Sequence, residues 1–152
     1  MQLKTIPPIH VLYFETKTSL NELSDYVRIV AQKLYRDAIQ NDMEVTGPIY
    51  WLYEGADGKP ETVFTLTIAL PVTPSPQNTS SEFQQKTLES FQCVSHELYG
   101  DWSGMMDAYG KIFSYIGAEN KIPSGLSREI YFNLDFENLD RNITEIQVGI
   151  LN

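Results

Sequence analysis

The sequence predicts an α+β fold of two similar β-α-β-β units, with antiparallel strands and one main helix in each unit. Three observations carry this prediction. Apolar and polar residues alternate over short segments bounded by Gly and Pro, which is typical of half-buried strands. Two longer segments instead repeat apolar residues at three- and four-residue steps, as helices with one buried face do. The order of these segments in the first half of the chain recurs in the second half.

In the first half, residues 10–15 are apolar and aromatic and are predicted to form a strand, since the two prolines just before them cannot join a ladder. Ser19 and Glu22 have the spacing of a capping box, so we predict that a helix begins there and ends near Gln40. Residues 49–54 and 62–70 are predicted to be the next two strands. The apolar stripe of the helix comprises Leu20, Leu23, Val27, Val30, Ala31, Leu34 and Ala38.

Residues 71–82 hold three prolines among polar residues, a composition that orders poorly. We therefore predict one domain over residues 1–152, with a first repeat at about 5–72, a linker at 73–88 and a second repeat at about 89–152. In the second repeat, strands are predicted at 91–98, 128–134 and 144–151, and Asp101 is a predicted helix cap. The stripe of the second helix comprises Trp102, Met105, Tyr109, Ile112, Phe113 and Ile116.

The two halves also match position by position, which indicates an internal repeat. Six members of the first stripe, Leu20 to Leu34, lie 82 residues before the six members of the second stripe. Tyr50 lies 79 residues before Glu129. Two such units that pair about a pseudo-twofold axis leave a groove where they meet, and pockets tend to form at such junctions. We therefore predict a ligand groove between the units.

Composition and short sequence patterns disfavour several function classes. The 152 residues carry a formal net charge of -9, which disfavours nucleic acid because that partner is held mainly by Lys and Arg. Cys93 is the only cysteine, so no internal disulfide can form. No apolar run is long enough to span a membrane and no signal peptide is evident, so we expect a cytoplasmic protein. His10 and His96 have no ligands at metal-binding spacing, and we expect neither a metal nor another cofactor.

Three short motifs carry a family resemblance: Gly47-Pro48-Ile49-Tyr50, Leu98-Tyr99-Gly100-Asp101-Trp102 and Arg128-Glu129-Ile130-Tyr131-Phe132. With the order of elements, they resemble the GyrI-like family, also called AraC-type or bacterial transcription-activator effector-binding domains. The resemblance implies two SHS2-like repeats with a small-molecule pocket between them. It also implies a pocket glutamate among aromatic side chains, and Glu129 matches that position. The family's Gly-Pro-Tyr before each helix is replaced here by Gly100-Asp101-Trp102 and Thr18-Ser19-Leu20.

Glu129 is the main candidate site residue. Alternation places Leu126, Arg128, Ile130, Phe132 and Leu134 on one face of its strand, and Ser127, Glu129, Tyr131 and Asn133 on the other. One alternative is that Glu129 lies on a solvated face and pairs with a lysine. The other is a carboxylate ringed by aromatic side chains, which suits a lipophilic, cationic aromatic ligand. The predicted ligand-binding residues are Glu129, Tyr50, Tyr131, Trp102, Trp51, Tyr13 and Phe64.

Three functions remain open at this stage. The family resemblance implies a stand-alone protein that senses or sequesters multidrug-type ligands and serves transcription regulation. It also implies a hydrolase of electrophilic, cyclopropane-type genotoxins, in which Glu129 would act as general base with Tyr50 or Tyr131 orienting the ligand or donating a proton. The acidic composition allows a third function, a regulator that binds a partner enzyme. A protein partner and a homodimer are both compatible with the sequence.

Overall fold

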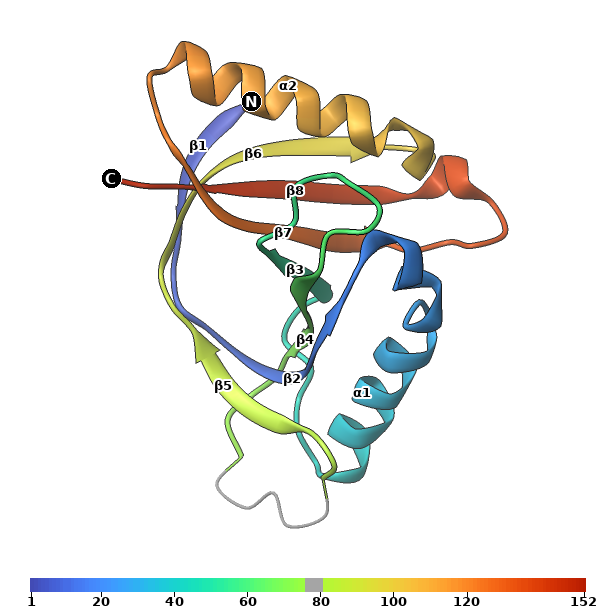
Figure 1. The fold of residues 1–152 in the computed structure, drawn as a ribbon. Coiled ribbons are helices and arrows are strands. Elements are labelled where there is room, and N and C mark those ends of the chain that lie inside the picture. The colour runs from blue at the N-terminus through green and yellow to red at the C-terminus, as the bar shows by residue number, and fades with distance from the viewer. Residues whose placement is uncertain (76–80) are drawn as a thin grey trace. The chain divides into compact units, whose positions relative to one another are not determined.

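The computed structural model describes residues 1–75 and 81–152, which form eight strands, two α-helices and three short 3-10 helices (Figure 1). The chain divides into two compact units. Residues Pro8–Glu89 form one, the N-terminal unit. Residues Met1–Pro7 and Ser90–Asn152 form the other, the C-terminal unit. No helix in the described part of the chain is long and apolar enough to cross a membrane.

The N-terminal unit contains a four-stranded antiparallel sheet with the strand order β3-β4-β2-β5. Its main helix, α1, follows the first strand and the 3-10 helix η1. In chain order its elements are β2 (Ile9–Thr18), η1 (Leu20–Asp25), α1 (Ile29–Gln40), β3 (Ile49–Glu54), β4 (Phe64–Pro71) and β5 (Gln84–Leu88).

The C-terminal unit repeats this plan with a sheet of order β1-β6-β8-β7, also antiparallel. The predicted α+β class and the β-α-β-β order of each repeat are thus confirmed. Its elements are β1 (Gln2–Ile6), β6 (Phe91–Tyr99), η2 (Trp102–Gly104), α2 (Met105–Ala118), β7 (Pro123–Asn133), η3 (Leu139–Arg141) and β8 (Ile143–Ile150).

Helix α2 covers one face of the C-terminal sheet. Ala108, Ile112 and Ile116 are buried against Val94, Ile146 and Val148 of β6 and β8. Burying a side chain of this size contributes about 1.5–3 kcal/mol, so this layer is the main stabilising contact of the helix. The predicted stripe was wrong at Phe113, which is 47% exposed. Phe113 follows the buried Ile112 in the helix and therefore points away from the face that packs on the sheet.

Helix α1 begins nine residues later than the capping box predicted, at Ile29 rather than Leu20. Residues 20–25 form η1, the Ser19 side chain makes no capping hydrogen bond, and Glu22 accepts a hydrogen bond from the Thr18 hydroxyl at 3.3 Å. Arg28, just before α1, has a φ of 70°, a conformation that interrupts a right-handed helix. The buried apolar positions of α1 are accordingly only Val30, Leu34 and Ala38.

Two strands were not predicted. β5 lies inside the segment predicted as a linker over 73–88 and pairs with β2 from Tyr13 to Ile9. β1 precedes the paired prolines and pairs with β6 of the C-terminal unit. Both are short edge strands with polar sequences, so they lack the apolar alternation that reveals a buried strand. Residues 76–80 of the predicted linker lie outside the described residues.

Strand β7 begins at Pro123 rather than at residue 128. Its register against β8 shifts between Pro123 and Ser127, where Gly125 has a φ of 87°. Glycine adopts this conformation without the steric cost of a side chain, so Gly125 allows the irregularity. On the facing strand, a Cβ atom at Gly149 would lie 2.8 Å from the Leu126 carbonyl oxygen. The two glycines therefore let β7 and β8 pair closely just before Glu129.

Candidate ligand-binding site

Glu129 lies on the helix-covered face of the C-terminal sheet. It pairs with Ile146 of β8, and Ser127 pairs with Val148, both of which pack beneath α2. Glu129 is only 6% exposed, so the alternative of a solvated carboxylate is wrong. Arg128 and Ile130 on the other face are buried as well. Strand β7 is thus covered on both faces at Glu129, whereas its end at Phe132 is exposed.

Two phenols hold the Glu129 carboxylate. The Tyr109 hydroxyl of α2 donates a hydrogen bond to Oε2 at 2.6 Å, and the Tyr131 hydroxyl of β7 donates one to Oε1 at 2.5 Å. Hydrogen bonds to an ionised acceptor are shorter and stronger than neutral ones, and these distances are of that kind. Burial and the neighbouring Glu129 charge raise the pKa of Tyr109 well above its usual value. Tyr109 therefore remains a protonated donor at neutral pH.

Aromatic rings extend this arrangement, which we call the Glu129 cluster: Glu129, Tyr109, Tyr131, Trp102 and Phe136. The Trp102 ring lies edge-on to Tyr131 with centroids 5.9 Å apart, and 5.4 Å from Phe136. The indole N–H of Trp102 donates to the Thr144 hydroxyl at 3.1 Å, which fixes the ring against the buried strand β8. The cluster therefore combines one carboxylate, two phenols, an indole and a phenyl ring.

Local hydrogen bonds explain why the sequence places Trp102 and Phe136 there. Asp101 caps η2 as predicted, because its carboxylate accepts from the Ser103 backbone N–H at 2.9 Å. The loop that carries Phe136 is anchored by the Asp135 backbone N–H, which donates to the side-chain oxygen of buried Asn142 at 2.6 Å. Short polar contacts in η2 and this loop thus orient the two rings.

Tyr109 and Phe136 were missed as site residues. Tyr109 sits in the apolar stripe of α2 and has the position of a core residue, yet it stands 82 residues after Val27 and is a polar substitution in the repeat. That difference is a signal that was present in the sequence. Phe136 lies outside any predicted element, so neither periodicity nor the repeat points to it.

The other predicted site residues belong to the N-terminal unit. Tyr13 and Tyr50 both pair with Ala69 of β4, so they share one face of that sheet and pack against the cluster around Val11 and Leu52. Trp51 and Phe64 are buried and flank Tyr53, with ring centroids 6.5 and 5.5 Å from it. The structure therefore brings together Glu129, Tyr131 and Trp102 in one unit. A role for Tyr13, Tyr50, Trp51 and Phe64 in the same ligand site stays a prediction.

The opposite face of the C-terminal sheet carries a buried polar group. The Lys4 ammonium of β1 lies 2.7 Å from the Glu145 carboxylate, which also accepts from the Gln147 amide. The Arg128 guanidinium lies 4.0 Å from the centre of the Phe91 ring. Burial, with the Glu145 charge, raises the pKa of the Cys93 thiol to about 11. The Lys4–Glu145 pair attaches β1 to the sheet, while burial and the Glu145 charge keep the Cys93 thiol protonated.

The model of a known protein family matches nearly the whole of this chain. The model for the GyrI-like small molecule binding domain matches residues 1–151. The chain belongs to the GyrI-like family. This match covers both units and confirms the resemblance that the short motifs carried. No curated protein sequence matches this chain.

Solved structures of GyrI-like fold agree with this assignment. The C-terminal domain of EcmrR has a TM-score of 0.81 at 15% identity, and the match covers 99% of this chain and 96% of that domain. SAV2435 bound to tetraphenylphosphonium has a TM-score of 0.67 at 15% identity, covering 99% and 93% of the two chains. A hydrolase from Listeria innocua has a TM-score of 0.71 at 15% identity, covering 99% and 91%. At these identities the likeness shows a shared fold.

Proposed function

We propose that this GyrI-like protein senses or sequesters lipophilic aromatic cations, and that Glu129 recognises their positive charge. The observation that carries the proposal is the buried Glu129 carboxylate, held by two phenols among aromatic rings. A buried carboxylate is costly unless it is paired with charge or hydrogen-bonded. Tyr109 and Tyr131 stabilise it in this protein, and a ligand cation would add the opposite charge. The binding of tetraphenylphosphonium by SAV2435, a protein of the same fold, supports this ligand class.

Aromatic rings contribute to the same recognition. Each ring face contributes about 0.5–2 kcal/mol to the binding of an organic cation, with the larger values where water is excluded. Trp102, Tyr131 and Phe136 lie within one contact network. The combination favours a ligand with a delocalised charge and a large apolar surface over a small, strongly hydrated cation.

The proposal is tested with Trp102 as reporter. Trp51→Phe leaves Trp102 as the only tryptophan, so tetraphenylphosphonium bound at the Glu129 cluster should change its fluorescence. In the variant that also carries Glu129→Gln, the Kd for tetraphenylphosphonium should rise by about 10-fold or more. The reason is that losing a hydrogen bond to a charged group costs about 1.5–3 kcal/mol. Glu137→Gln removes an exposed carboxylate from the same unit and is the matched control. Equal affinity in the Glu129 and Glu137 variants would refute the role of Glu129.

Hydrolysis of an electrophilic, cyclopropane-type compound is the second candidate function. It is favoured by one observation, a carboxylate shielded from bulk water beside two phenols, which is an arrangement suited to a general base. A hydrolase from Listeria innocua also shares the fold. Product formation by the wild type, lost in Glu129→Ala while substrate binding persists, would support catalysis. Binding without product across a panel of such substrates would leave sequestration alone.

A further inference from the structure

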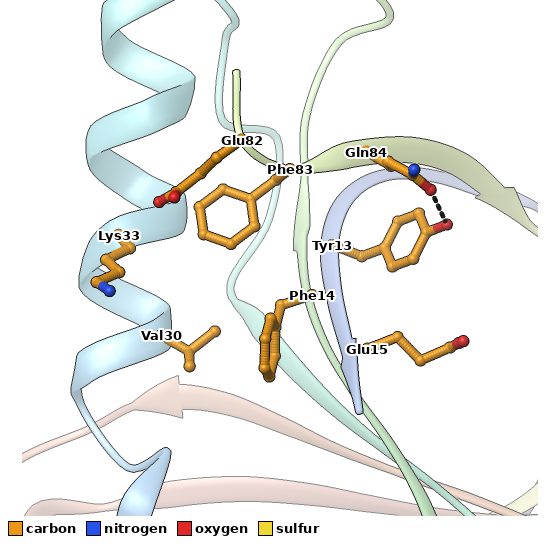
Figure 2. Close-up of a pocket in the computed structure, with 8 residues that line it drawn as sticks. All are labelled: Tyr13, Phe14, Glu15, Val30, Lys33, Glu82, Phe83 and Gln84. Carbon is orange, nitrogen blue, oxygen red and sulfur yellow. Dashed lines mark hydrogen bonds between the residues drawn. The ribbon is translucent and has the colours of Figure 1, made fainter. Parts of the chain in front are cut away.

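The N-terminal unit contains a cavity of about 510 Å³ whose lining includes no residue of the Glu129 cluster (Figure 2). It lies where β5 leaves β2. β2 continues to Thr18, but β5 pairs with it only as far as Tyr13. Residues 82–84 turn from this point toward α1, so a space opens between the helix and the half of β2 that pairs with β4 but not with β5 (Figure 2). Its volume falls within the range of about 300–1,000 Å³ that small-molecule pockets occupy.

Apolar side chains form the middle of this cavity. Phe14 of β2, Val30 of α1 and Phe83 lie between the helix and the strand (Figure 2). The Phe14 ring also contacts the ring of Tyr26 in a tilted arrangement, with centroids 5.9 Å apart. Two phenyl rings and a branched aliphatic side chain are a surface suited to the flat body of an aromatic ligand.

The position of Phe83 is fixed by contacts to α1. The Ser81 hydroxyl donates to the Asp37 carboxylate, which is buried in the helix, and the Phe83 backbone N–H donates to the Ser81 oxygen at 3.0 Å. Asp37 thus ties the segment just before β5 to α1. This side of the cavity is built by specific hydrogen bonds to a buried group.

Polar groups line the two sides of the cavity. Lys33 and Glu82 lie on the helix side, while Glu15, Gln84 and the Tyr13 hydroxyl lie on the strand side (Figure 2). Lys86 offsets the charge of Glu15, and Lys33 and Glu82 carry opposite charges, so the attraction for a cation comes from the Glu82 carboxylate itself and from the net charge of -9 of the chain. Lys86 lies 3.5 Å from the Glu15 carboxylate, which leaves Glu82 as the carboxylate better placed for a ligand.

We propose that this cavity is a second small-molecule site, which takes a flat aromatic cation between Phe14 and Phe83 with its charged group toward Glu82. The site belongs to the N-terminal unit and does not depend on the function proposed for Glu129. A chain that also binds a ligand at the Glu129 cluster would hold two ligands.

The test measures binding of ethidium, a flat aromatic cation, in the Glu129→Gln variant. One equivalent of ethidium should still bind, with enhanced fluorescence. Adding Phe83→Ala should weaken this binding about 2- to 30-fold, the range for loss of one aromatic face, whereas Phe83→Tyr should retain it. Glu82→Gln should weaken it by up to about 5-fold, as expected for an exposed ion pair.

Tyr35→Ala, which removes an exposed aromatic side chain of α1 outside the cavity, is the matched control and should leave ethidium affinity unchanged. Thermal unfolding of every variant checks that the unit stays folded. Loss of all ethidium binding in Glu129→Gln would overturn the proposal, as would an ethidium affinity that Phe83→Ala leaves unchanged. A missing Trp102 response to tetraphenylphosphonium, together with Phe83-dependent ethidium binding, would instead refute the Glu129 function and leave this site standing.

Discussion

At the scale of single residues, Tyr109 and Tyr131 make Glu129 tolerable inside the C-terminal unit. Each phenol donates to a different carboxylate oxygen, at 2.6 and 2.5 Å. One donor comes from the helix and the other from the same strand, so the pair also ties α2 to β7. The carboxylate is therefore part of the packing of the unit as well as a candidate for ligand recognition.

Tyr109→Phe tests this coupling. Removing the hydroxyl leaves a buried carboxylate oxygen without its phenol donor, which should lower the free energy of unfolding by about 1–3 kcal/mol. Denaturant unfolding measures the change. In Glu129→Gln the same substitution should cost less, because the acceptor is no longer charged. An equal cost in both backgrounds would show that the two residues do not interact. Tyr115→Phe, half-buried in the same helix, is the control.

Cys93 provides a second prediction at this scale. With a pKa of about 11 the thiol is almost wholly protonated at pH 8, and its side chain is fully buried. The thiolate is the reactive form, so its fraction is about a hundredfold below that of a thiol with a pKa of 9. A thiol-disulfide reagent should therefore react slowly with the native protein at pH 8 and rapidly after unfolding. Native reaction at the unfolded rate would contradict the burial of Cys93.

At the scale of elements, two glycines should respond to alanine in opposite directions. Gly125 has a φ of 87°, where a side chain is strained, so Gly125→Ala should destabilise the protein by about 1 kcal/mol or more. Gly110 lies within α2, and a Cβ atom there would meet no neighbour within 4 Å. Gly110→Ala should stabilise by about 0.5–1 kcal/mol through helix propensity. Thermal or denaturant unfolding compares the two, and changes of the same sign would contradict the assigned β7 geometry.

The elements also show what sequence patterns predict well. β3 and the strands with apolar alternation were located to within a few residues, since burial on a sheet face produces that alternation. The predicted start of α1 was wrong. The capping-box spacing at Ser19 gives no sign of the turn at Arg28, whose positive φ interrupts the helix before Ile29. Edge strands β1 and β5 carry polar residues and have no such signature. The two tyrosines of the Glu129 cluster differ in the same way, since Tyr131 shares a strand face with Glu129 while Tyr109 reaches it only through tertiary packing.

At the scale of the whole molecule, the first strand belongs to the C-terminal unit, although the chain then continues into the N-terminal unit. The Lys4–Glu145 pair at 2.7 Å links residues 141 positions apart. Sequence adjacency gives no indication of this pairing. The repeat explains the β-α-β-β core of each unit, and β1 and β5 are the additions that the repeat does not predict.

Lys4→Met tests the attachment of β1. It leaves the Glu145 carboxylate, 9% exposed at its side chain, without its ammonium partner. The free energy of unfolding should fall by about 1–3 kcal/mol. This is less than the roughly 3–5 kcal/mol for breaking a fully buried pair, because Lys4 is partly exposed. Lys4→Met/Glu145→Gln should recover part of the loss. Lys17→Met, which replaces an exposed lysine, is the control. No difference between Lys4→Met and Lys17→Met would contradict the account of this strand.

The central claim is that the Glu129 carboxylate recognises a positive charge, and one comparison tests it most directly. Calorimetry would measure the affinities of tetraphenylphosphonium and of uncharged triphenylphosphine oxide for the wild type and for Glu129→Gln. The wild type should prefer the cation by about 10-fold or more, and the variant should lose most of that preference. Equal affinity of the wild type for both compounds, or the same preference in both proteins, would contradict the claim.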